Sequence, residues 1–270
     1  VDARREWGGG HTRAAMNQQY CSAAYMDWVQ MFVGRLDNFA TRLCEIMGNN
    51  ISSLAILVVT ALIGNAHAAA LKPMSATYAV VRNGKPLGDA SYSLVANKDG
   101  SWTLRSVTKG SAGMAKLLGL DVHEESTFRW QDGKPQGLHY DYKQDAAIKS
   151  KRREIDFDWR ENQARVRDNG KDFAYAIPSG TIDRSTVAVA LGQAVAAGAR
   201  DATLPVAAKD HVEQQTFATR GEEKINVPAG SFDAVRVERT DAAGKARSWY
   251  APNVTTLPLR VEQLQGDGST

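Results

Sequence analysis

Histidine and carboxylate side chains in the middle of the chain are the residues whose types and spacing suggest metal chemistry. His139 and Asp141 lie two residues apart in a segment where polar residues alternate with Leu138, Tyr140 and Tyr142. Side chains two positions apart on a β-strand point to the same face, so this imidazole and carboxylate could supply two ligands to a metal ion. Two ligands fall short of a complete site. We therefore predict a solvated strand face here, and no metal.

A second pair of carboxylates suggests acid–base chemistry. Asp156 and Asp158 would share one face of a strand, as paired carboxylates do in general acid–base catalysis. Glu154 and Arg160 fall on the same face, which favours a charged exterior instead. The sequence also has no G-x-S-x-G nucleophile elbow, no P-loop and no G-x-G-x-x-G after a strand. We predict no catalytic residues, no enzymatic activity and no cofactor.

A basic run precedes the same segment and has two interpretations. Lys149, Lys151, Arg152 and Arg153 lie at the start of a predicted strand. They could meet lipid phosphates or another anionic component of a cell envelope. They could equally be the charged end of a hairpin that prevents edge-to-edge pairing.

Aromatic residues are concentrated in the same part of the chain, mostly on the apolar phase of successive predicted strands. One interpretation is an ordinary core, and the other is a concave sheet whose aromatic lining holds an apolar ligand. Both require the same inward-facing residues. The candidate ligand-binding set is Trp102, Phe128, Trp130, Tyr140, Tyr142, Phe157 and Trp159.

The elements that position these residues are predicted strands joined by tight turns. Polar and apolar residues alternate with period 2 through most of residues 75–177, and Asn83-Gly84 and Asn169-Gly170 are strong hairpin signals. Further strands are expected at 212–219, 222–227, 234–239, 246–250 and 257–264. This pattern predicts an all-β fold, an antiparallel meander curled into a barrel or half-barrel.

Two helices are expected to interrupt the strands. A short one covers residues 111–118, between Gly110 and Gly119. A longer one covers residues 183–198, with Asp183 as its N-cap and Gly198 at its end. A single amphipathic helix in a β protein usually packs on the sheet or fills a barrel mouth.

The stretch 47–68 has the layout of a cleavable secretory signal peptide. Ten residues, 54–63, contain one polar member, Thr60, and are followed by the small residues Ala66-His67-Ala68. A transmembrane helix would need about 20 apolar residues. Residues 1–46 are expected to be an over-extended start or else a genuine amphipathic helical extension, for which positions 29–46 have the helical spacing. Residues 69–270 are expected to form a single β domain.

Cysteine positions and charge restrict location and partners. Cys21 and Cys44 both precede the apolar run, so the processed chain would have no disulfide and no lipidated cysteine after the signal. The formal net charge of +3 is too small to indicate a nucleic-acid partner. We expect a periplasmic protein without a permanent membrane anchor.

Several segments resemble one family of exported bacterial proteins, the domain-of-unknown-function 3108 family. They are INVPAGSFDAVRVER (225–239), SWYAP (248–252), LPLRVEQ (257–263), GKPLGDASYSL (84–94), REIDFDW (153–159) and IDRSTVAVAL (182–191). The resemblance spans about residues 75–265. It implies an antiparallel β structure akin to periplasmic lipoprotein carriers, and it supplies no catalytic residues.

Together these observations predict a non-catalytic exported protein that binds or carries an apolar or amphipathic envelope ligand such as a lipid. The alternatives are a scaffold that pairs with an envelope protein through a β edge, and a hydrolase of an envelope component.

Overall fold

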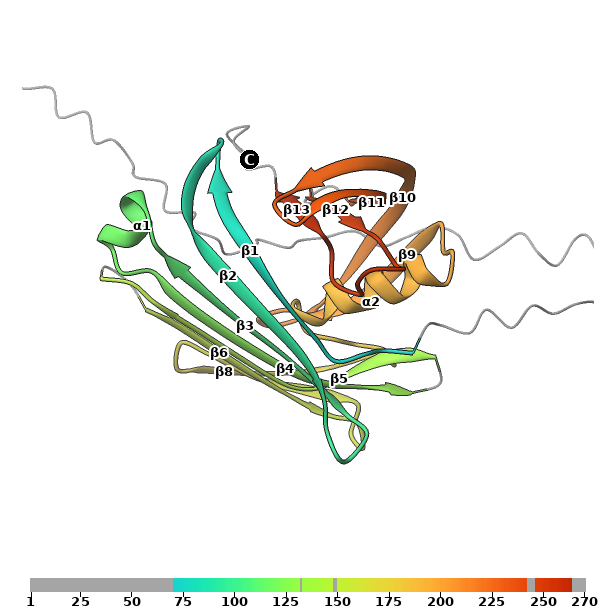
Figure 1. Cartoon of the computed structure of the whole chain (residues 1–270). Coiled ribbons are helices and arrows are strands. Elements are labelled where there is room, and N and C mark those ends of the chain that lie inside the picture. Colours follow the sequence, from blue (N-terminus) through green and yellow to red (C-terminus); the bar gives the residue numbers. More distant parts are fainter. Residues whose placement is uncertain (1–69, 132, 148–149, 242–245, 264–270) are drawn as a thin grey trace, which may run out of the picture.

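The computed structural model describes residues 70–131, 133–147, 150–241 and 246–263. The predicted signal peptide and everything upstream of it lie outside these residues. Within them, the chain forms two antiparallel sheets and two helices (Figure 1). No helix of this described part is long and apolar enough to cross a membrane.

The first sheet is an eight-stranded meander in which each strand pairs with the next along the chain. Its strands are β1 (Met74–Arg82), β2 (Lys85–Ala96), β3 (Trp102–Gly110), β4 (Asp121–Gln131), β5 (Lys134–Asp145), β6 (Lys151–Asp158), β7 (Gln163–Asp168) and β8 (Lys171–Ala176). Asn83 and Gly84 both have positive φ angles, 49° and 73°, as do Asn169 and Gly170, 51° and 81°. Positive φ angles at both central residues are what a type I′ hairpin turn requires, so the predicted Asn-Gly turns are confirmed.

The second sheet has five strands in the order β13-β12-β11-β10-β9. They are β9 (Asp201–Ala207), β10 (Val212–Val227), β11 (Gly230–Arg239), β12 (Ala246–Tyr250) and β13 (Arg260–Gln263). The strands differ here from the expectation in two ways. The segments 212–219 and 222–227 form one strand, because Gly221 (φ 103°) makes a bulge and both parts continue to pair with β11. Strand β9 was not predicted, and Pro205 within it is accommodated because β9 is an edge strand.

Both helices form close to their predicted positions. Helix α1 covers Gly113–Leu117 and α2 covers Thr186–Ala196. Helix α2 packs tightly against the chain that follows β12. A Cβ added at Gly192 would lie 1.9 Å from the backbone oxygen of Thr256, so only glycine permits this approach.

Helix α2 is enclosed between the two sheets, on the inner side of the curved eight-stranded sheet (Figure 1). Its Leu191 belongs to a core cluster with Phe217 and Tyr250 of the second sheet. Its Val189 belongs to another cluster with Phe128 of β4. The ends of the long sheet, β1 and β8, do not pair with each other. The fold class is therefore confirmed as all-β with a half-barrel that does not close.

Candidate functional site

The inner face of the long sheet carries a charged cluster where the N-terminal end of α2 meets β4. Arg184 contacts Glu124 at two points: Nη2 lies 2.7 Å from Oε1, and Nε lies 3.1 Å from Oε2. The two side chains are only 21% and 17% exposed. A bidentate ion pair that water screens poorly is among the stronger polar contacts in proteins. It fixes the start of α2 over the sheet.

Asp183 reinforces the same junction. Its fully buried carboxylate accepts hydrogen bonds from the backbone N–H groups of Ser185 and Thr186, at 2.9 and 3.0 Å, and from the hydroxyls of Ser126 and Thr186, at 2.7 Å each. Burial raises the pKa of Asp183, and these hydrogen bonds offset part of that rise. The predicted N-cap position was wrong, because α2 begins at Thr186 with Ser185 directly before it. The Asp183 side chain nevertheless accepts hydrogen bonds from the backbone N–H groups at this helix start. The cap also connects α2 to β4 through Ser126.

Two tyrosines of β5 complete the cluster. The Tyr140 hydroxyl donates to Glu124 Oε2 at 2.7 Å, and the guanidinium of Arg184 lies 4.4 Å from the ring centroid of Tyr142. Burial, first, and the negative charge of Glu124 raise the pKa of Tyr140 well above its usual value. This phenol therefore stays protonated and acts as a hydrogen-bond donor. Tyr142 in turn donates to Gln144 Oε1 at 2.5 Å.

The Glu124 carboxylate is ionised, and both of its oxygens accept hydrogen bonds. Burial alone would raise its pKa, but the charge and hydrogen bonds of Arg184, with donors from Ser185 and Tyr140, hold the pKa below its ordinary value. The Ser185 hydroxyl donates at 2.6 Å. A general acid or base works best with a pKa near the operating pH and a free position for the proton it moves. The pKa of Glu124 is lowered away from neutral pH and both of its oxygens hold hydrogen bonds at the start of α2, so the cluster is suited to anchoring this helix.

The seven candidate aromatics divide between two parts of the inner face. Trp102, Phe128 and Trp130 belong to the cluster beneath Val189 of α2. The others, Tyr140, Tyr142, Phe157 and Trp159, belong to a cluster over β4–β8. Phe128, Tyr140, Tyr142 and Phe157 are buried, whereas the three tryptophans are half-buried. The inward orientation expected from the strand phase is thus present, but the set does not form one continuous patch.

Trp159 and Phe157 have a structural explanation of their own. The Trp159 Nε1–H donates to the backbone oxygen of Gly137 at 2.7 Å. Its ring stacks on Phe157, with centroids 6.4 Å apart. A Cβ at Gly137 would lie 2.7 Å from the Phe157 ring. These residues form a close packing unit between β5 and the end of β6.

The half-buried aromatics beside α2 are different. Trp102 and Trp130, together with Tyr92, pack against the buried Phe128 and Leu94 without being covered themselves. Trp130 contacts Phe128 edge to face, with centroids 6.3 Å apart. We call Tyr92, Trp102 and Trp130 the aromatic rim. It is a partly exposed apolar surface continuous with the core.

The predicted polar residues lie on the opposite, outer face. His139 Nδ1 lies 2.8 Å from Asp156 Oδ1, across the β5–β6 pair. Asp141 is 3.4 Å from Lys143 Nζ. Asp158 pairs with Arg165 at 3.1 Å and accepts hydrogen bonds from backbone N–H groups in the turn that follows. Asp156 and Asp158 thus have different partners, and neither faces the interior cluster.

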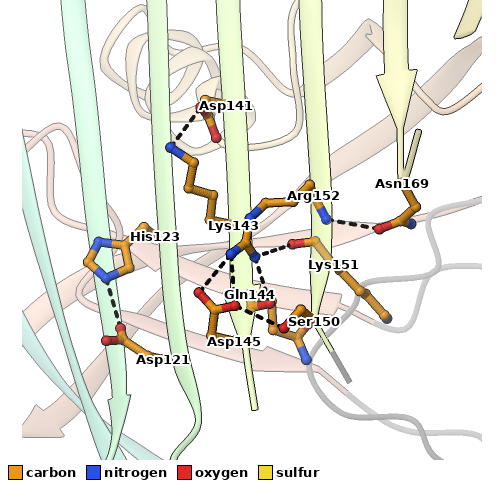
Figure 2. A network of polar contacts seen from close by, with 10 residues as sticks. All are labelled: Asp121, His123, Asp141, Lys143, Gln144, Asp145, Ser150, Lys151, Arg152 and Asn169. Carbon is orange, nitrogen blue, oxygen red and sulfur yellow. Dashed lines mark hydrogen bonds and ion pairs between the residues drawn. The ribbon is translucent and has the colours of Figure 1, made fainter. Parts of the chain in front are cut away.

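The basic run is largely engaged in intramolecular contacts (Figure 2). Arg152 Nη2 contacts both oxygens of Asp145, at 2.8 and 3.0 Å, and its Nη1 donates to two backbone oxygens. Arg153 turns to Asp168, 2.8 Å away. These contacts favour the charged hairpin end over a phosphate-binding patch. Lys149 lies outside the described residues.

The charged cluster itself was not predicted. Its members Glu124 and Arg184 are 60 residues apart in sequence, and no local spacing connects them. One signal was present: Glu124 occupies the apolar phase of its strand, between Val122 and Phe128, which share its face. An acidic residue in that phase needs a buried partner.

Comparisons with known proteins identify a family. The family described as "Protein of unknown function (DUF3108)" matches residues 75–270. A search of curated proteins found no match. Among solved structures, the chain is similar to a β-barrel-like protein of domain of unknown function DUF1849 from Brucella abortus, with 13% identity and a TM-score of 0.41, covering 67% of this chain and 87% of that one.

Proposed function

Since the chain belongs to the DUF3108 family of proteins of unknown function, we propose its function from its own geometry: it is an exported, non-catalytic protein that binds one apolar or amphipathic envelope ligand, such as a lipid, at the aromatic rim. The observation that carries this proposal is the partial exposure of Tyr92, Trp102 and Trp130 around the fully buried Phe128.

The rim has the chemistry of an apolar binding surface. Tryptophan and tyrosine offer large apolar rings with a polar edge, and this combination suits a surface that is apolar on one side and wet on the other. Phe128 and Leu94 beneath the rim are 0% exposed, so a bound chain would rest on rigid packing. Because the eight-stranded sheet does not close into a barrel, the aromatic rim beside α2 is not enclosed by strands on all sides.

The interior cluster supports binding without catalysis. Glu124 accepts hydrogen bonds from Arg184, Tyr140 and Ser185 and has a lowered pKa. Its role is to hold α2 in place against the sheet. A fixed α2 keeps the rim pre-organised, which reduces the entropic cost of binding.

The proposed location rests on the sequence. The apolar run of residues 54–63 and Ala66-His67-Ala68 indicate export to the periplasm, with cleavage after Ala68. N-terminal sequencing of protein recovered from the native envelope should give a first residue within two positions of Ala69. Recovery of intact residues 1–46 would contradict export by this signal.

Binding at the rim is tested with vesicle lipids and native mass spectrometry. Wild-type protein incubated with mixed phospholipid vesicles should retain one lipid, and Trp102→Ala and Trp130→Ala should each reduce the bound fraction. Trp159→Phe is the matched control, because Trp159 is also a half-buried tryptophan but packs between β5 and β6. Equal occupancy in wild type and both rim variants, with folding verified by circular dichroism, would contradict binding at the rim.

A β-edge scaffold is the second candidate. Val261, on the edge strand β13, is 60% exposed, and exposed edges can receive a strand from a partner. A stable co-purifying envelope protein that is lost in Val261→Lys would favour this function. Strand β13 is only four residues long and carries Arg260 and Glu262, as protected edges commonly do.

A further inference from the structure

The outer face of β5 and β6 brings together three side chains of the kind that bind metal ions. His139 and Asp156 are directly opposite each other in the strand register, and Glu154 is two residues from Asp156 on the same face. One ligand atom from each of these residues lies within 4.8 Å of the other two. Among the described residues, no other group of three histidine, cysteine or acidic side chains meets this spacing. The side chain of His139 is 37% exposed, that of Asp156 61% and that of Glu154 45%, so an ion can reach them.

One neighbouring cation pairs elsewhere, and another is shared between this group and a second carboxylate. Arg165 is the register partner of Asp156 but makes its ion pair with Asp158, at 3.1 Å. Arg167 is the register partner of Glu154. Its Nη1 makes a long ion pair with Glu154 Oε2 at 3.9 Å, while its Nε contacts Asp172 Oδ1 at 3.1 Å. Two carboxylates therefore share their surroundings with one histidine and with one exposed arginine, Arg167, whose charge is divided between Glu154 and Asp172.

We propose that His139, Glu154 and Asp156 form a binding site for one divalent transition-metal ion on the outer face of the sheet. One imidazole nitrogen and two carboxylate oxygens suit ions of the Zn²⁺ and Cu²⁺ class, whereas Mg²⁺ and Ca²⁺ prefer oxygen ligands alone. Three protein ligands on a flat face leave the remaining coordination positions to water.

The present geometry needs only small adjustments to accept such an ion. A tetrahedral ion with ligands at about 2.1 Å separates those ligands by about 3.4 Å. His139 Nδ1 and Asp156 Oδ1 are now 2.8 Å apart, at hydrogen-bond distance. The ion would replace the proton between these two atoms, and that proton would leave to solvent. Rotation of the exposed Glu154 side chain brings the third ligand into place.

The site is separate from the proposed ligand surface. The side chains of His139, Glu154 and Asp156 point away from the inner face, where Tyr140 and Ile155 of the same strands are buried. A bound ion would connect β5 to β6 from outside. It would thus stabilise this strand pair without touching the aromatic rim.

The test is a Zn²⁺ titration of the full chain after removal of metal with a chelator, followed by isothermal calorimetry. His139→Ala, Glu154→Gln and Asp156→Asn should each weaken one binding event by about tenfold or more, since even residues behind metal ligands contribute 10–100-fold. His123→Ala is the matched control, because His123 is an exposed histidine paired with a single carboxylate, Asp121. It should bind as wild type does.

Copper provides a second readout that a purely structural role would not change. In electron paramagnetic resonance, Cu²⁺ bound to wild type should show coupling to one imidazole nitrogen, and His139→Ala should lose it. The cysteines and the histidines other than His139 are common to wild type, His139→Ala, Glu154→Gln and Asp156→Asn, so only a difference among these proteins reports on this site. Absence of Zn²⁺ binding, or binding that is unchanged in His139→Ala and Glu154→Gln, would overturn the proposal and leave an adventitious ion only.

Discussion

Removal of Arg184 should destabilise the fold far more than removal of a neighbouring surface arginine. In Arg184→Met, the Glu124 carboxylate would lose both contacts with the guanidinium, at a place where its side chain is only 17% exposed in the wild-type structure. Breaking a buried ion pair by deleting one partner costs about 3–5 kcal/mol, because an uncompensated charge stays buried. We expect a cost at the low end of this range, about 3 kcal/mol. Both groups are partly exposed, and Glu124 would keep its hydrogen bonds from Tyr140 and Ser185.

The matched comparison lies one residue away. Glu125 is next to Glu124 on β4 but faces outward, where it pairs with Arg105 at 2.6 Å, with both side chains about half exposed at 43% and 54%. Exposed pairs contribute about 0.2–1 kcal/mol, so Arg105→Met should cost less than about 1 kcal/mol. The double variant Arg184→Met/Glu124→Gln should be more stable than the sum of its single variants predicts, because it leaves no buried charge unpaired.

Urea unfolding followed by tryptophan fluorescence and circular dichroism measures these differences, provided that both probes give one coincident transition. The slope with urea should be unchanged, so that the midpoint reports stability. If Arg184→Met costs no more than Arg105→Met, the cluster does not anchor α2 and the reasoning about the interior is refuted.

Three further outcomes follow from the packing of α2 and from Glu124. In an exposed helix, Gly→Ala raises stability by about 1 kcal/mol. Gly192→Ala should instead destabilise the protein, since the new Cβ would lie 1.9 Å from the backbone oxygen of Thr256. A raised melting temperature would contradict this close packing of α2 against Thr256. Leu191 is 4% exposed and lies beside a cavity of about 10 Å³, so Leu191→Asp should cost several kcal/mol by burying a charge. Leu117 on α1 is 74% exposed, so Leu117→Asp should cost less than about 0.5 kcal/mol. Equal costs in urea unfolding would mean that α2 is misplaced. Because the pKa of Glu124 in the folded protein is below its ordinary 4.5, ionised Glu124 stabilises the fold above that pH, and this stabilisation is lost as the pH falls through the folded pKa. Acid titrations monitored by circular dichroism should show that Glu124→Gln lacks this loss of stability. Acid unfolding curves of the same shape for wild type and Glu124→Gln would contradict this role of Glu124.

Local signals predicted much of the fold. Asn-Gly turns and period-2 alternation act over a few residues, so the hairpins β1–β2 and β7–β8 could be placed from sequence. Where a local signal was ambiguous, the prediction failed. Arg220-Gly221 has the composition of a turn but forms a bulge within β10. Strand β9 was not predicted, because Pro205 argues against a strand except at the edge of a sheet, where β9 lies.

The candidate site could not be predicted in full, because it is formed by contacts between residues far apart in the sequence. Strand phase placed the aromatic side chains on the inner face correctly, but which of them stay half-exposed depends on where α2 and the second sheet lie. The pair of Glu124 and Arg184, and the approach of His139 to Asp156, arise from long-range register. Sequence spacing paired His139 with Asp141, whereas the strand register places it opposite Asp156 on the next strand.

The central claim, that this protein carries an apolar or amphipathic ligand at the aromatic rim, is tested most directly by gentle native mass spectrometry of protein purified from its own envelope. The bound fraction is extracted and identified. We predict one amphipathic molecule per chain, retained in Trp159→Phe and depleted in Trp102→Ala. Protein that is consistently empty, or a ligand equally retained in Trp102→Ala, would contradict the claim.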